Sequence, residues 1–253
     1  MKYTKAKILS NIEISTGIYK MVVEDFNKVN AGQFYMLKHQ GATLLPRPIS
    51  VSEKEENSVT FVYAVVGTGT YEFSSLREGE SIELIGPLGN GFDVEKKYNK
   101  VALVAGGIGI APMLELSKKL RQNNTDIKMD LYAGFRDDIY LTDEIGQYTN
   151  EVYVSTNTGK HGHKGFVTDL LEVKNYDTVL CCGPEIMMKK VIDMCKENNI
   201  KSCDNNTVDV YVSMEKHMAC GVGACLVCTC KTKDGNKRTC KDGPVFDGNY
   251  VKL

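Results

Sequence analysis

Cysteines are distributed unevenly along this chain of 253 residues, and their distribution constrains the fold more than any other feature. None of the nine cysteines precedes Cys181, and five of them lie between Cys220 and Cys240. The count is odd, and the N-terminal run MKYTKAKILS lacks an apolar segment followed by a small-residue cleavage site. A secreted disulfide framework is therefore not expected. The clustering instead predicts metal ligation in a reducing compartment, and we expect a cytoplasmic protein.

Four of the clustered cysteines follow the pattern C-x4-C-x2-C-x11-C, namely Cys220, Cys225, Cys228 and Cys240. The first three positions, C-x4-C-x2-C, match the spacing of a plant-type [2Fe-2S] site. Two thiolates must reach each iron, and small residues such as Gly221, Gly223 and Ala224 would let backbone amides approach the sulfides. We therefore predict a [2Fe-2S] cluster on these four cysteines.

Two alternatives concern the same segment. A zinc site is possible in principle, although it usually combines two C-x2-C pairs. Cys230 is a fifth cysteine, and because residues two apart share a face of an extended strand, it could lie beside Cys228. We assign the fourth position to Cys240, since the ordered-looking run KDGPVF follows it. The cysteines expected not to be ligands are Cys181, Cys195, Cys203 and Cys230.

The first part of the chain, residues 1–98, has the pattern of a β protein. Short segments rich in β-branched and aromatic residues, Gln33–Lys38, Ser58–Val66 and Ser81–Ile85, are separated by Gly, Pro and Asn. Only Tyr71–Arg77 resembles a helix. This pattern predicts an antiparallel β barrel.

In residues 99–213, strands alternate with helices, which predicts a parallel sheet with right-handed crossovers. The expected strands are Val101–Ala105, Ile127–Phe135, Val152–Ser155 and Thr178–Cys182. The expected helices are a run that ends at Gln122 and the segment Glu185–Asn199. Residues 214–253 contain too few apolar residues for a core of their own, so we expect a small lobe that the cluster holds together.

Two turns in the α/β part predict a dinucleotide site. The run VALVAGGIGIAPM places Gly106, Gly107 and Gly109 between a buried strand and a helix. Such glycines let the backbone approach a pyrophosphate at the helix N-terminus. Alone they would also fit an ordinary strand-helix turn. The second turn, Cys182-Gly183-Pro184, follows a later strand and would lie at the same edge of the sheet.

These motifs resemble the ferredoxin reductase family, in which an N-terminal FAD-binding barrel precedes a nucleotide-binding domain. The resemblance covers the chain to about residue 213. It implies that an Arg-x-x-Ser stretch holds the flavin and that Cys182 and Gly183 lie next to the nicotinamide, with Cys182 as the residue beside the reacting ring. The FAD contacts implied by the resemblance are Arg47, Pro48, Ile49, Ser50, Val62, Tyr63, Ala64, Gly69 and Thr70.

The last forty residues resemble one particular group of proteins within this family. The runs SMEKHMACGVGACLVCTCK and RTCKDGPVF are similar to those of the electron-transfer subunits of heteromeric, NAD-linked dihydroorotate dehydrogenases. This resemblance implies one FAD, one [2Fe-2S] cluster and an FMN-containing catalytic partner subunit in a heterotetramer, which oxidises dihydroorotate in pyrimidine synthesis. Electrons would pass from the partner FMN through the cluster and FAD to NAD+. Ala31 departs from the proline that relatives commonly have before the glycine.

Other functions are less consistent with the sequence. A net charge of −1 argues against a nucleic-acid partner, and the longest apolar stretch, Val101–Leu116, is too short to span a membrane. A reductase subunit linked to ferredoxin, hydrogenase or sulfur reduction stays open, as does a zinc-held nucleotide-binding module without redox function. His161 and His163 are expected to be solvated. NAD(H) should be preferred over NADP(H), because the loops near 135–138 and 155–159 carry one arginine beside two acids.

Overall fold

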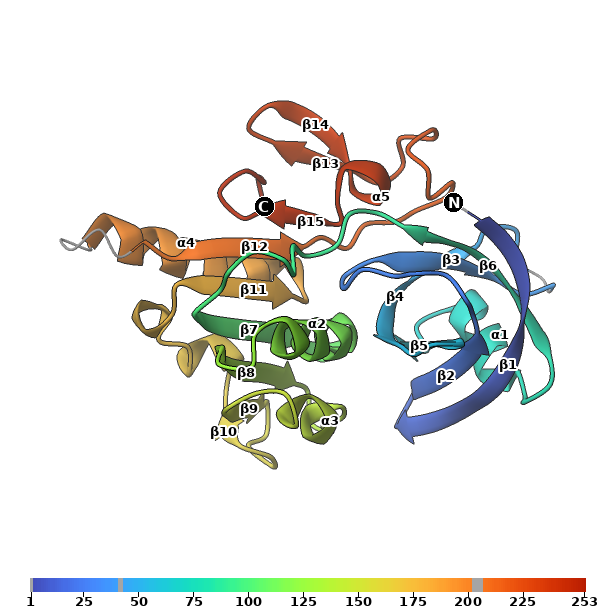
Figure 1. Cartoon of the computed structure of the whole chain (residues 1–253), viewed down its shortest axis with the longest axis horizontal. Coiled ribbons are helices and arrows are strands. Elements are labelled where there is room, and N and C mark those ends of the chain that lie inside the picture. The colour runs from blue at the N-terminus through green and yellow to red at the C-terminus, as the bar shows by residue number, and fades with distance from the viewer. Residues whose placement is uncertain (1, 41–42, 202–206) are drawn as a thin grey trace.

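The N-terminal part of the computed structural model is a closed barrel of six antiparallel strands (Figure 1). The structure describes residues 2–40, 43–201 and 207–253. The strands pair in the order β1-β2-β5-β4-β3-β6, and alternating burial along β6 shows one face turned to the barrel interior. Their bounds are Lys2–Ser15 (β1), Ile18–Glu24 (β2), Phe34–Lys38 (β3), Arg47–Lys54 (β4), Ser58–Ala64 (β5) and Ser81–Leu88 (β6).

One α-helix accompanies the barrel strands in the described residues before β7, as the sequence predicts. Helix α1 spans Thr68–Ser75 and therefore begins three residues before the expected start at Tyr71. The reason is local, since the Thr70 hydroxyl accepts hydrogen bonds from the N–H groups of Val66 (2.9 Å) and Gly67 (3.3 Å). These bonds fold the turn that starts the helix.

The second part is a seven-stranded sheet in the order β10-β9-β8-β7-β11-β12-β15. The strands are Lys100–Gly106 (β7), Lys128–Phe135 (β8), Val152–Thr156 (β9), His163–Lys164 (β10), Thr178–Cys182 (β11), Asp209–Ser213 (β12) and Val245–Asp247 (β15). Neighbouring strands are parallel except β15, which pairs antiparallel with β12. The predicted parallel sheet is thus confirmed.

Helices cover both faces of this sheet. Their bounds are Ala111–Asn123 (α2), Thr142–Gly146 (α3) and Glu185–Lys201 (α4), with 3-10 turns at Gly107–Ile110 (η1), Val167–Asp169 (η2) and Val173–Asn175 (η3). Val101 and Leu103 of β7 pack in one core with residues of α2, whereas Ala102 and Val104 pack in a second core with residues of α4. Burial on both faces explains the continuous apolar run of β7.

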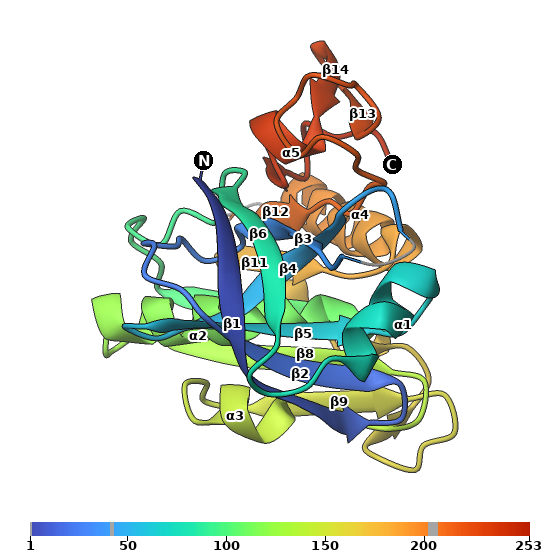
Figure 2. The ribbon, with the colours of Figure 1, turned by 90° about the vertical axis from the view of Figure 1, so that its right-hand side faces the viewer.

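The C-terminal segment lies across both larger parts (Figure 1, Figure 2). It contains a hairpin of β13 (Thr229–Thr232) and β14 (Gly235–Arg238), the short helix α5 (Thr239–Asp242) and strand β15. Phe246 and Val251 pack in the core beside α4. The expectation that a metal site alone holds this segment is therefore incomplete, because strand pairing and apolar contacts also hold it. The domain limits 1–98, 99–213 and 214–253 stay a prediction.

No helix among the described residues is long and apolar enough to cross a membrane.

Candidate flavin, nucleotide and cluster sites

The predicted flavin residues come together where strand β4 meets helix α1. Arg47 begins β4 opposite Leu37 of β3, and it lies against the backbone of Gly69. A methyl group added at Gly69 would lie 2.6 Å from Arg47 Nε, so a larger residue here would displace the guanidinium from this turn. The guanidinium donates to the Leu45 carbonyl at 2.8 Å. It is partly exposed beside a helix N-terminus, an arrangement that suits a pyrophosphate.

The other predicted flavin residues differ in what they offer. Pro48, Ile49 and Ser50 are partly exposed along β4. Val62 and Tyr63, in contrast, are each 2% exposed, and Tyr63 donates to Asn11 Oδ1 at 3.1 Å. Their side chains belong to the protein cores, so the main chain is what they could present to a ligand.

Two further residues show the same contrast. Ala64 is partly exposed, and its small side chain leaves room for a ligand. The Thr70 side chain is buried, and its hydroxyl is already used in folding the turn before α1.

Exposed apolar side chains flank these motifs, and sequence reasoning did not single them out. Leu44 and Leu45 precede Arg47, while Val66 and Tyr71 stand on either side of Gly69 and Thr70. Thr43 of the first loop donates to Glu72 of α1 at 3.1 Å, which ties the two segments together. Apolar groups of this size beside an arginine could cover the rings of a flavin.

The two predicted nucleotide turns lie in contact. Strands β7 and β11 are parallel neighbours, and Ala105 is opposite Cys182, so both turns leave the same edge of the sheet. A methyl group at Gly109 would lie 2.5 Å from the Cys182 carbonyl oxygen, and one at Gly183 would lie 2.8 Å from the Gly106 nitrogen. Glycine is required because the backbones pack directly on each other.

Gly107 contributes differently, with a φ of 54° and open space around it. Pro112 follows in the first turn of α2, where its missing N–H costs nothing.

The chemistry of Cys182 favours a positioning contact over nucleophilic attack. Its side chain is partly exposed at the end of β11, opposite Ser213 of β12. Burial raises the pKa of the Cys182 thiol to about 12, with a further increase from the charge of Glu215 and an opposing hydrogen bond from Ser213. The group is thus a neutral thiol at neutral pH, and a thiolate nucleophile is not expected there.

The loops that would face the adenosine half of a nucleotide carry paired charges. Thr158 donates to Asp137 Oδ1 at 2.8 Å, and Lys160 Nζ lies 3.1 Å from Asp138 Oδ1. His163 is exposed, with Nε2 at 3.8 Å from Asp169 Oδ2. The lysine nearest to these acids is therefore already neutralised.

The predicted cluster ligands form two pairs of thiols. The backbone N–H of Cys225 donates to Cys220 Sγ, and the backbone N–H of Cys240 donates to Cys228 Sγ. In the described part of the chain, no three His, Cys, Asp or Glu side chains are placed to hold a single metal ion. Two thiol pairs suit a two-iron cluster, in which each iron takes two protein ligands.

Backbone amides approach the thiols closely, as a sulfide-bridged cluster requires. Cys220 Sγ accepts the N–H groups of Val222 and Cys225, both at 3.4 Å. Cys228 Sγ accepts the N–H of Cys240, also at 3.4 Å. Gly221 adopts a φ of 69°, and a methyl group there would lie 2.7 Å from Met36 Cγ. The segment therefore fits the group that its donor atoms predict.

The pKa values of Cys220 and Cys240 shift in opposite directions. Burial raises the pKa of Cys220, but the backbone N–H groups of Cys225 and Val222 lower it more, to about 6, which favours the thiolate form that binds a metal. Burial and the neighbouring Cys228 raise the pKa of Cys240 to about 12. Its deprotonation needs a nearby cation, which a bound iron would supply.

The remaining cysteines lie elsewhere. Cys228 and Cys240 pack with Phe34 and Met36 of the barrel, whereas Cys230 is buried in the other core with the sheet and α4. Its position supports Cys240 as the fourth ligand, which stays a prediction. Cys181 and Cys195 are also buried in the core that includes α4. Cys203 lies outside the described residues.

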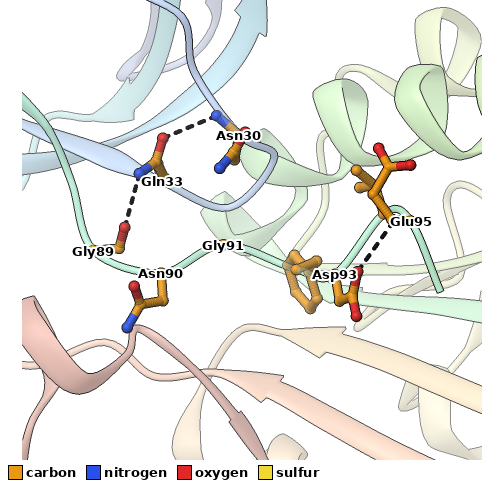
Figure 3. Close-up of a pocket in the computed structure, with 9 residues that line it drawn as sticks. Asn30, Gln33, Gly89, Asn90, Gly91, Asp93 and Glu95 are labelled. Carbon is orange, nitrogen blue, oxygen red and sulfur yellow. Dashed lines mark hydrogen bonds between the residues drawn. The ribbon is translucent and has the colours of Figure 1, made fainter.

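A polar cavity of about 330 Å³ lies at the junction of the barrel and the other two parts (Figure 3). Gln33 spans it, since its side chain accepts the N–H of Asn30 at 2.9 Å and donates to the Gly89 carbonyl at 2.8 Å. The Asn90 side chain donates to the Lys241 carbonyl at 3.1 Å. None of the predicted cofactor residues lines this cavity, so it is separate from the site.

A barrel with an arginine against a helical turn, followed by a sheet with two apposed glycine turns, is the arrangement of a flavin- and nicotinamide-dependent reductase. The thiol pairs extend this class to reductases with an iron-sulfur segment. The family model for the iron-sulfur cluster binding domain of dihydroorotate dehydrogenase B matches residues 215–252. The model for the oxidoreductase NAD-binding domain matches residues 103–193.

Comparisons over the whole chain agree. The chain is 66% identical over 253 residues to the electron transfer subunit of dihydroorotate dehydrogenase B (NAD(+)) of Clostridium perfringens, covering 100% of this chain and 99% of that protein. Identity to the corresponding subunit of Clostridium acetobutylicum is 49% over 253 residues, covering 100% and 98%. The solved structure of an NADH-dependent reduced ferredoxin-NADP oxidoreductase, reported for flavin-based electron bifurcation, matches with a TM-score of 0.85 and 27% identity, covering 98% of this chain and 90% of that chain. This chain belongs to the family of dihydroorotate dehydrogenase B electron transfer subunits.

Proposed function

We propose that this chain carries electrons from the oxidation of dihydroorotate, which takes place on an FMN-containing partner subunit, to NAD+. The observation that supports this most directly is the contact between the cluster segment and the flavin strands. Cys228 and Cys240 share a core with Met36 of β3, and Met36 pairs with Pro48 in the predicted flavin motif of β4. A cluster on these thiols would therefore lie next to the flavin.

Different residues of the chain would hold each cofactor. When bound, NAD+ accepts a hydride, the flavin exchanges hydride and single electrons, and the [2Fe-2S] cluster passes one electron at a time. Arg47 would bind the FAD pyrophosphate, and the turns at Gly106–Gly109 and Cys182-Gly183 would bring the nicotinamide to the flavin. No nucleophile of the chain is needed, which agrees with the neutral thiol of Cys182.

The partner and the cellular setting follow from the same reaction. We propose that the chain works in a heterotetramer with the FMN subunit, in pyrimidine synthesis. A cytoplasmic location is proposed because thiolate ligands need a reducing compartment.

The two alternatives are less well supported. A subunit linked to ferredoxin, hydrogenase or sulfur reduction would share the barrel and sheet, but the family match over the full chain favours dihydroorotate. A zinc-held module without redox function does not agree with the matched cluster-binding family.

Cofactor analysis tests the proposal. We expect the anaerobically purified chain to contain one FAD and, per chain, two irons with two inorganic sulfides. Zinc that persists after reconstitution, with iron below half of the expected content, would contradict the cluster. The partner recovered with a tagged chain separates dihydroorotate from ferredoxin or hydrogenase as the electron source.

A further inference from the structure

A buried carboxylate joins the flavin barrel to the nucleotide helix. Glu115 lies in α2 and its side chain is 0% exposed. Its Oε2 atom accepts the backbone N–H of Lys54, at the end of β4, at 2.9 Å. Its Oε1 atom has no hydrogen bond among the described residues, and Lys119 Nζ lies 3.7 Å away from that atom.

The Glu115 carboxylate accepts a hydrogen bond at an edge of β4 that no neighbouring strand among the described residues covers. Strand β3 pairs with β4 only along Arg47–Ser50, and Glu115 accepts the N–H of Lys54 farther along β4. The Lys54 ammonium turns back to the barrel and donates to the Asp25 carbonyl at 2.9 Å. The helix side chain thus continues the hydrogen bonding of the strand.

Ion pairs flank this bond on the same two elements. Lys118 Nζ of α2 lies 3.0 Å from Glu53 Oε1 and also contacts Glu55. Glu53 and Lys54 at the end of β4, and Glu55 just after it, therefore meet α2, with Glu115 as the buried central contact. Lys118 and Glu53 are partly buried, whereas Glu55 is 59% exposed, so the pair with Glu55 contributes little on its own. Glu115 is the one acid of the three whose side chain is fully buried.

A glutamate is an unusual residue at position 115 if its side chain serves only to fill the core. The neighbours of Glu115 that face the core are apolar, Leu114 and Leu116 among them. Burial raises the pKa of Glu115, while the Lys54 N–H opposes that increase. A buried carboxyl group is costly unless it is hydrogen-bonded, so a residue retained only for packing would be apolar.

Both elements lead from this contact to the proposed reaction site. Strand β4 runs from Arg47 to Lys54, so the flavin motif and the contact are on one strand. Helix α2 begins at Ala111, two residues after Gly109, so the nucleotide turn and Glu115 are on one rigid segment. A shift of α2 against β4 would move the nicotinamide against the flavin.

We propose that Glu115 is a positioning residue that fixes the nucleotide turn relative to the flavin strand and so sets the geometry of hydride transfer between NAD(H) and FAD. This inference rests on the proposed function. Small displacements of reacting groups have large effects on rate, about 100-fold for 1 Å.

The test measures NADH-driven flavin reduction in the full chain loaded with FAD, by stopped-flow absorbance. In Glu115→Ala and Glu115→Asp, we expect the rate at saturating NADH to fall about 10- to 100-fold, with unchanged Kd for NADH and unchanged FAD content. Glu115→Gln should keep most of the rate, because its amide oxygen can still accept the Lys54 N–H. Glu55→Ala, which removes an exposed charge at the same contact, is the matched control and should stay within about twofold of wild type.

A second readout does not depend on activity. Hydrogen exchange of the β4 peptide should speed up in Glu115→Ala and Glu115→Asp but not in Glu115→Gln. If Glu115→Ala does not fold, Glu115→Asp decides the matter. Unchanged exchange, or faster exchange with an unchanged rate at saturating NADH, would overturn the inference. If the wild-type chain fails to bind FAD or to react with NADH, that result contradicts the proposed function instead. The exchange measurement would still show whether Glu115 stabilises the end of β4.

Discussion

At the residue scale, side-chain direction decides which thiols can reach one cluster. The spacing of the cysteines predicts three ligands but cannot choose between Cys230 and Cys240. The structure places them differently, since the Cys240 N–H donates to Cys228 Sγ and Cys230 is buried in the core beside α4. This difference depends on packing against the barrel and sheet, which the spacing alone does not encode.

Substitution of single cysteines tests this assignment. Cys230→Ser should retain the cluster, because the Cys230 side chain is buried in the core with the sheet and α4. Replacement of Cys220, Cys225, Cys228 or Cys240 by serine should lose it, since one iron would lack a thiolate ligand. Iron and sulfide content, with the visible spectrum, provides the measurement. Loss of iron in Cys230→Ser together with retention in Cys240→Ser would show that the fourth ligand is wrong.

For other residues, the sequence motif predicts a role but not the contacts or burial of the side chain. Arg47 and Gly69 belong to motifs, and the structure brings them into contact. Tyr63 stays a predicted FAD contact, and because its hydroxyl is bonded to Asn11, its main chain is the part that would meet the flavin. Glu115 lies in the helical pattern of α2 beside charged residues, and nothing in that pattern indicates that it is buried against another domain.

At the element scale, strands and helices with strong periodicity were predictable, and short pairings were not. The parallel strands and α4 follow from apolar runs and from a one-sided helix face. Strand β15 has three residues, and it pairs with β12 because the C-terminal segment returns to the sheet. A pairing of such different sequence positions has no local signature.

The charges of the loops after β8 and β9 predict a preference for NADH over NADPH. Wild-type chain should have a higher kcat/KM for NADH than for NADPH, because Asp137 and Asp138 repel a 2′-phosphate and Asp138 pairs with Lys160. In Asp138→Asn, we expect kcat/KM for NADPH to rise about 2- to 5-fold, since Lys160 is released and an exposed charge pair contributes up to roughly 1 kcal/mol. Steady-state dye reduction with both nucleotides measures this.

A matched substitution controls for charge alone. Glu172→Gln removes an exposed acid that pairs with Lys174, and it should leave the nucleotide preference unchanged. Wild-type preference for NADPH, or an equal response of both variants, would contradict the assigned loops.

At the scale of the whole molecule, the C-terminal segment connects the barrel and the sheet while leaving one face of the predicted cluster open. Cys228 and Cys240 are buried against the barrel, but Cys225 is exposed. Leu226 and Val227 beside it are 62% and 53% exposed. The exposed lysines of this segment are Lys231, Lys233, Lys241 and Lys252, with Lys216 and Lys237 partly exposed. An apolar centre with charged surroundings is suited to a protein that delivers single electrons.

This arrangement predicts that the chain does not oxidise dihydroorotate alone. Each named strand of the described residues belongs to the barrel, the sheet or the β13-β14 hairpin, and these parts are assigned to FAD, NAD and the cluster. We therefore expect the isolated chain to reduce dyes with NADH but to show no dihydroorotate-dependent NAD+ reduction until the FMN subunit is added. Leu226→Asp should weaken this coupled activity about 10-fold or more, because it places a charge at the centre of the docking face, while NADH-dye activity stays unchanged. Full dihydroorotate activity without a partner, or none in a stable complex with the FMN subunit, would refute the division of labour between the two subunits.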